Sequence, residues 1–169
     1  MIYLSKETVI LPKIEYSTTD LDNMKTVFEK LKNHHLHKGE TLTVSDTYIN
    51  LILKDNLDLE NRFYIRFIQD SANVLFSLPI PFMRRFANGS CNVAILYNNG
   101  TLDISITDLI INDMLMSDKE MNSLEAVIKS YLSRNKRLNQ YLQSISSVSI
   151  KNDTLYITFS SVDIHDNGS

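Results

Sequence analysis

Three histidines stand close together in the first quarter of the chain, at positions 34, 35 and 37: His34, His35 and His37. Neutral imidazole is a common ligand of zinc and copper, so such a cluster raises the question of a metal site. No cysteine, aspartate or glutamate at a recognised zinc spacing accompanies the three rings. We therefore interpret them as the solvated end of a helix, where a protonated histidine suits the helix dipole. We predict no metal site and no cofactor.

Two arginines, Arg84 and Arg85, lie between the pair Phe82-Met83 and Phe86. Guanidinium groups bind phosphates in a bidentate fork, so the pair could hold a phosphate or a lipid head group. The apolar neighbours would then meet acyl chains or a membrane surface. The alternative, which we prefer, is a loop that packs its phenylalanines inward and leaves its arginines in water.

The only cysteine, Cys91, alternates with Val93 and Ile95 on an expected strand. A cysteine in this setting is more often a small buried hydrophobe than a nucleophile. The chain has no Gly-x-Ser-x-Gly elbow, no P-loop and no Gly-x-Gly-x-x-Gly motif. We therefore predict that the protein is not an enzyme.

The composition is that of an ordinary folded protein. The 169 residues are 43% hydrophobic and 22% charged, with a net charge of −3, which gives no reason to expect a nucleic-acid partner. We expect one α+β domain over residues 1–162, followed by a polar, disordered tail over residues 163–169. No apolar run approaches the ~18 residues of a membrane span, and the start lacks the pattern of a signal peptide. Two expectations stay open: a cytoplasmic protein, or an envelope ectodomain without its leader.

One long amphipathic helix over residues 117–145 is the element expected to organise the fold. Its apolar positions recur at helical spacing, with Leu124, Ile128 and Tyr131 on the central stripe. Ser117 and Glu120 have the spacing of a capping box at its start. The polar run over residues 133–137 is its weak point, where the helix could break.

The other elements are a first helix, hairpins, and a segment over residues 48–53 that forms a short buried helix or, alternatively, a strand. Cap residues 17–20 begin the first helix, which is expected to end near Gly39. Ser45 is the expected N-cap of the short helix. Alternating apolar residues predict paired strands over residues 62–69 and 74–78, over 91–97 and 102–106, and over 148–150 and 155–159. Asn99-Gly100 is expected to turn the second pair, and the phase change at Asp108 indicates a β-bulge or a sharp bend. Strands that come in hairpins predict an antiparallel sheet.

The order of these segments resembles a known family. The chain has a cap-and-helix motif, a hairpin with an Asn-Gly turn, and a closing hairpin, reading LTVSDTYINLIL, CNVAILYNNGTLDISI and VSIKNDTLYITF. This order resembles bacterial envelope lipoproteins and anchored proteins of the tubular lipid-binding, or TULIP-like, type. The resemblance implies a strongly curved antiparallel sheet that wraps a long helix, with an apolar groove for lipid between them. It also favours a periplasmic or membrane-anchored ectodomain over a cytoplasmic protein.

We therefore expect an α+β fold in which a curved antiparallel sheet of about six strands wraps a long C-terminal-half amphipathic helix, with an additional N-terminal helix. The expected function is non-catalytic binding of a lipid or another apolar ligand in the bacterial envelope, with the membrane surface as a further expected partner. The alternative is a structural or assembly domain with a filled core and no ligand, whose protein partner the sequence does not identify. The residues nominated to line the ligand groove are Phe67, Phe76, Ile95, Ile104, Leu124, Ile128 and Tyr131, with Arg84 and Arg85 at its mouth.

Overall fold

The computed structural model describes residues 4–32, 37–57, 62–98 and 100–160. The helices are α1 (Thr18–Lys32), α2 (Asp46–Leu57), α3 (Asp118–Arg134) and α4 (Lys136–Gln143). The strands are β1 (Thr41–Ser45), β2 (Phe63–Ile68), β3 (Ser71–Ile80), β4 (Arg85–Asn98), β5 (Thr101–Ile111), β6 (Met114–Leu115), β7 (Ile145–Lys151) and β8 (Thr154–Phe159).

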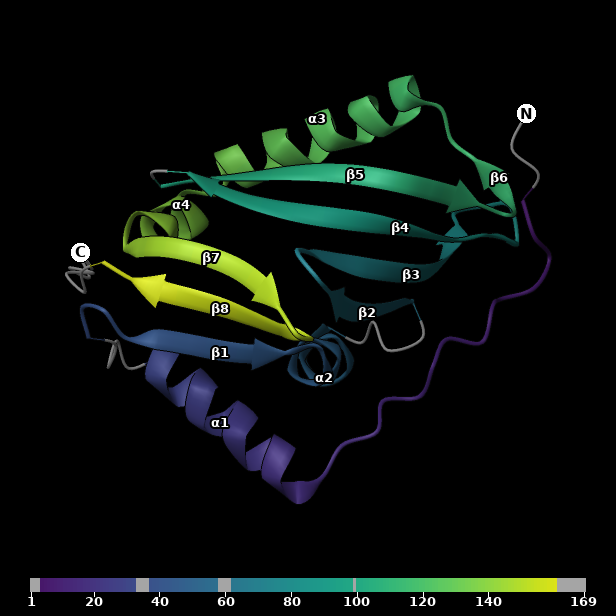
Figure 1. Cartoon of the computed structure of the whole chain (residues 1–169). Helices are drawn as coiled ribbons and strands as arrows, with labels where there is room; N and C mark the ends of the chain where they lie inside the picture. The colour runs from purple at the N-terminus through teal and green to yellow at the C-terminus, as the bar shows by residue number, and fades with distance from the viewer. Residues whose placement is uncertain (1–3, 33–36, 58–61, 99, 161–169) are drawn as a thin grey trace.

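The described strands form two antiparallel sheets (Figure 1). The larger sheet is a meander in the order β2-β3-β4-β5-β6, and the smaller has the order β1-β8-β7. α3 lies alongside β5 at one side of the molecule, and α1 lies below β1 at the other (Figure 1). The α+β class and the antiparallel pairing are thus confirmed.

The expected single sheet wrapped on one long helix is wrong. The helix ends at Arg134, because Asn135 leaves the helical conformation with ψ of 92°, and α4 begins at Lys136. No residue of α3 is fully buried; the side chain of Leu124 is 37% exposed and that of Tyr131 is 70% exposed. The polar run over residues 133–137 offers no apolar side with which a continuous helix could lie on the sheet. α3 is therefore a cover at the sheet's margin and not the centre of the core.

The expected hairpins are confirmed by their register. Phe63 lies opposite Phe76 in the first hairpin, and Ile95 lies opposite Ile104 in the second. Asn98 pairs with Thr101, so two residues make the second turn. Gly100 has φ of +84°, the left-handed conformation that such a turn needs, while Asn99 lies outside the described residues. The closing hairpin also forms, as β7 and β8.

The predicted bulge lies where the alternation breaks. Asn92 pairs with Thr107 but Ser90 pairs with Ile110, so β5 carries one more residue than β4 between these pairs. Asp108 takes the extra place with φ of 52°. The bulge restores the apolar phase, so that Leu109 is buried as Ile106 is.

The predicted helix starts are also confirmed. Ser17 caps α1: its hydroxyl accepts the N–H of Asp20 at 3.2 Å, and Asp20 Oδ2 accepts the N–H of Ser17 at 2.7 Å. The Ser45 hydroxyl accepts the N–H of Tyr48 at 3.3 Å at the start of α2. The described part of α1 ends at Lys32, short of the predicted end near Gly39.

The described core consists of three clusters. Leu42, Val44, Tyr48 and Phe159 are buried on the small sheet and α2, with Met24 and Val27 of α1 packed against them. Phe67, Ala72 and Ile150 are buried where the two sheets meet. The third cluster lies on the large sheet toward α3, and its buried members are Phe76, Cys91, Ile106, Leu109 and Met116. Within the described ranges, no helix is long and apolar enough to cross a membrane.

Candidate functional site

α3 covers the free edge of β5. β6 pairs only with Ile110 and Ile111, so the rest of that edge needs another cover. Glu125 of α3 covers one point of this edge, because its Oε1 accepts the N–H of Ile106 at 2.6 Å. One turn further along α3, Lys129 Nζ lies 2.7 Å from Asp103 Oδ1 of β5. A carboxylate and an ammonium group therefore fasten the helix to the strand.

Lys129 and Asp103 shift each other's pKa values in the expected directions. The hydrogen bond from Lys129 lowers the pKa of the Asp103 carboxyl, and the same bond raises the pKa of Lys129. Both side chains are about half exposed, so solvent screens the pair and it contributes little to folding stability. Glu125 Oε2 also lies 3.6 Å from Lys129 Nζ, so two carboxylates hold the ammonium group at one place on the surface.

That place is the rim of a partly open hollow of about 320 Å³ between β5, α3 and α4. Leu102, Leu132 and Leu142 supply its apolar walls, and Asp103 and Lys129 lie on its lining beside them. The hollow exists because the helix breaks. Asn139 of α4 donates its side-chain N–H to the carbonyl of Ser133 at 2.8 Å, which holds the two helices at an angle that a continuous helix would not allow. The rest of its lining is Gly100, Thr101, Ser133 and Asn139.

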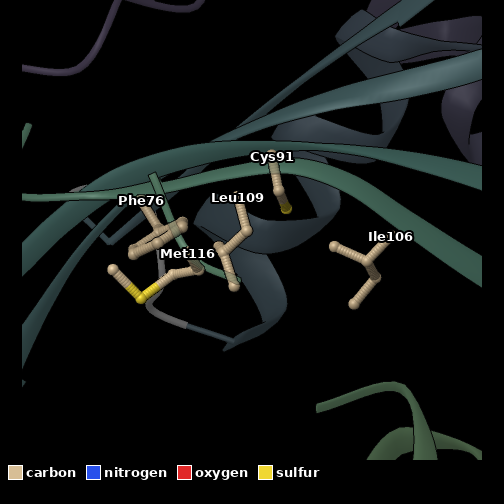
Figure 2. Close-up of a cluster of buried hydrophobic side chains, with 5 residues drawn as sticks. All are labelled: Phe76, Cys91, Ile106, Leu109 and Met116. Atoms are coloured by element: carbon tan, nitrogen blue, oxygen red, sulfur yellow. The ribbon is translucent and has the colours of Figure 1, made fainter. Parts of the chain in front are cut away.

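The third core cluster lies on the same apolar face of the large sheet as Leu102. Figure 2 shows its five buried side chains on one side of the sheet. Met121 and Ile128 of α3 pack against this cluster from the edge, while Val74 and Val93 in the middle of the sheet are only half-buried. The hollow therefore lies beside the buried apolar face of the large sheet.

The structure divides the residues nominated for a ligand groove. Phe76 and Ile128 belong to the cluster beside α3, and Ile104 is buried. Phe67 and Ile95 instead belong to the cluster between the two sheets, which β7 covers with Ile150. Leu124 is 37% exposed and Tyr131 is 70% exposed. By register, the nominated strand residues share one face of the large sheet, although they belong to different clusters.

Arg84 and Arg85 lie at the turn between β3 and β4 and do not border the hollow. Arg84 is exposed, and Arg85 donates to the carbonyl of Leu4 at 3.4 Å. The interpretation that this loop packs its phenylalanines inward is wrong for Phe82, which is fully exposed, whereas Phe86 is half-buried.

Cys91 is buried, as its alternation with Val93 and Ile95 predicted, and His37 is exposed. Cys91 is buried in the third cluster, and burial raises the pKa of its thiol, so the reactive thiolate is disfavoured. His34 and His35 lie outside the described residues. Among the residues with a described position, no three metal-binding side chains come together.

Sequence reasoning missed the hollow and its lining. Leu132 and Leu142 both lie on the apolar stripe of the expected helix, on opposite sides of the polar run over residues 133–137. A helix that breaks between two apolar stretches must leave a concave corner, so this interruption was the available signal. No protein-family model matches the chain, and no curated protein matches it.

Proposed function

We propose that the protein is a non-catalytic binder of a small lipid-like amphiphile, which it takes into the hollow between β5, α3 and α4. One observation carries this proposal: apolar walls formed by Leu102, Leu132 and Leu142 stand next to the ammonium group of Lys129. An apolar chain would occupy the walls, while a carboxylate or phosphate head group would compete with Asp103 and Glu125 for Lys129.

The size of the hollow sets the length of the ligand. A volume of about 320 Å³ is at the lower end of small-molecule sites, so it suits a short chain or the end of a longer one. Each methylene buried there contributes ~0.8 kcal/mol, so several are needed for micromolar binding. The hollow is partly open, so a longer chain would leave part of its length outside it.

A titration with a fluorescent medium-chain fatty acid tests the proposal, using protein stripped of lipid by organic extraction or a hydrophobic resin. We expect saturable binding at micromolar protein. Leu132→Trp should abolish it by filling the hollow, while circular dichroism shows an intact fold. Val127→Trp is the matched control, because Val127 lies on the outer side of the same helix with 67% of its side chain exposed. Absence of saturable binding, or equal binding by both variants, would refute the proposal.

An assembly domain is the second candidate, and a different observation favours it. Leu124, Val127 and Tyr131 form an exposed apolar face on the outer side of α3, away from the hollow. If the stripped protein binds no fatty acid but sediments as a larger species at high concentration, and Tyr131→Ser prevents that association, then the assembly function replaces the lipid-binding one.

A further inference from the structure

The turn between β3 and β4, residues 81–84, carries an aromatic side chain in an unusual position. Phe82 is fully exposed, and its neighbour Met83 is 59% exposed. Phe82 also has φ of 68°, in the left-handed region that a bulky side chain rarely adopts. Asparagine or glycine would fit this backbone with less strain and would expose no apolar surface. Phe82 therefore combines a strained backbone conformation with an aromatic ring that is exposed to solvent.

The charge around this turn is locally positive, in a chain whose net charge is −3. Arg84 follows Phe82 and Met83 in the turn itself, and Arg85 begins β4. The N-terminal segment brings Lys6 to the same end, because Ser5 and Phe86 exchange both backbone hydrogen bonds, at 3.0 Å and 2.9 Å. Two exposed apolar side chains thus lie beside three cationic ones.

Two acidic residues lie near this end: Glu7 directly follows Lys6, and Asp113 follows Asn112, whose side-chain N–H donates to the carbonyl of Phe86 at 3.4 Å. The carbonyl of Glu7 accepts the side-chain N–H of Asn88 at 2.9 Å, and Asn112, which precedes Asp113, donates its N–H to the carbonyl of Asn88 at 2.7 Å. Asn88 is three residues along β4 from Arg85, which corresponds to about 10 Å of strand. The stretch over residues 81–85 itself carries two arginines, Arg84 and Arg85, and no acidic residue.

We propose that this hairpin end docks on an anionic lipid bilayer, with Phe82 and Met83 inserted at the level of the head groups and the three cations against the lipid phosphates. Amphipathic residues of this kind gain from burial in the interfacial layer, and each cation near an anionic surface adds to the attraction. The proposal does not depend on the hollow beside α3, which lies at the other end of β5.

Flotation of the full chain with vesicles tests this proposal. One set of vesicles contains phosphatidylcholine alone, and the other an equal mixture of phosphatidylcholine and phosphatidylglycerol. We expect binding to the mixed vesicles, which raised salt weakens, and little binding to phosphatidylcholine alone. Phe82→Asn should weaken binding about tenfold through loss of the buried ring, and Arg84→Asn about fivefold through loss of one cation.

Asparagine is chosen as the replacement so that both variant proteins stay folded. Phe82 and Arg84 both have positive φ, which asparagine tolerates, so both variants should melt at the wild-type temperature or above it. Leu96→Ser is the matched control, because Leu96 is an exposed apolar residue near the opposite end of β4. Equal binding to both kinds of vesicle, no binding to either, or wild-type binding by Phe82→Asn would overturn the proposal. Fatty-acid titration without vesicles should be unaffected by Phe82→Asn, so the two proposals can fail separately.

Discussion

Gly89 shows how much a single position in the large sheet is constrained. It lies on β4 directly opposite Phe76 of β3, and the aromatic ring occupies the space that a side chain would need. A Cβ at Gly89 would lie 2.0 Å from the carbonyl oxygen of Ile110 and 2.6 Å from the Phe76 ring. The oxygen belongs to the backbone of β5 beside the bulge, so it cannot move without disturbing the pairing of β4 with β5.

We expect Gly89→Ala to lower the free energy of unfolding by about 3 kcal/mol, because the added methyl group overpacks against a backbone that cannot yield. Urea denaturation measures the change. Gly39→Ala is the matched control: Gly39 has φ of +80°, but a Cβ added there would meet no atom within 4 Å, so the cost should be only about 1 kcal/mol. Equal losses at the two glycines would contradict the packing argument.

The start of α3 is the element whose prediction from sequence succeeded in most detail. The expected pair Ser117 and Glu120 is present, and Glu120 Oε2 accepts both the N–H of Ser117 at 2.9 Å and its hydroxyl at 2.8 Å. The backbone hydrogen bond from Ser117, followed by the one from its hydroxyl, lowers the pKa of the Glu120 carboxyl. The ionised carboxylate is therefore the form that stabilises the helix start.

This lowered pKa predicts a direction of pH dependence. The stabilisation from Glu120 should be fully present above its ordinary pKa of about 4.3, and should be lost as the pH falls through the lower pKa of the folded protein. Glu120→Gln should therefore reduce the melting temperature at neutral pH, and the difference from wild type should shrink in acid. Glu15→Gln, in the exposed N-terminal segment, is the control and should leave the melting temperature unchanged both at neutral pH and in acid. A difference that grows in acid would refute this role.

Local patterns predicted most elements because their causes are local. The alternation around Ile95 and Ile104, the turn before Thr101 and the phase change at Asp108 each depend on neighbours within a few residues. The arrangement of α3 could not be predicted in this way. The apolar stripe of α3 showed which side chains are apolar. Whether Leu124 faces the core depends instead on where the helix lies relative to the sheet edge. The hydrogen bond between Glu125 and Ile106 fixes that position. The candidate hollow was missed for the same reason, since the angle between two helices creates it.

At the scale of the whole molecule, Tyr97 joins the two sheets. It lies near the end of β4, and its hydroxyl oxygen is 2.9 Å from the carbonyl oxygen of Leu142 in α4 and 2.5 Å from that of Ile145 in β7. The same oxygen accepts the N–H of Gly100 at 2.9 Å. One side chain of the large sheet thus holds the segment that leads into the small one.

We expect Tyr97→Phe to lower the free energy of unfolding by ~1–3 kcal/mol, because it leaves part-buried backbone groups without their partner. Guanidinium denaturation followed by circular dichroism measures the loss. Tyr131→Phe removes a hydroxyl from a side chain that is 70% exposed, and should change nothing. If both variants unfold at the wild-type denaturant concentration, Tyr97 does not hold the two sheets together.

The pairing of β1 with β8 has a consequence for co-translational folding. In the large sheet each strand pairs with the next one to be synthesised, so the meander can assemble as the chain emerges. β1 emerges early but must wait for β8, because Thr41 pairs with Thr158 near the far end of the described chain. During that interval the edge of β1 and the apolar side chains of Leu42 and Val44 have no partner strand. Nascent chains are thus most exposed to chaperones, and to aggregation, around β1.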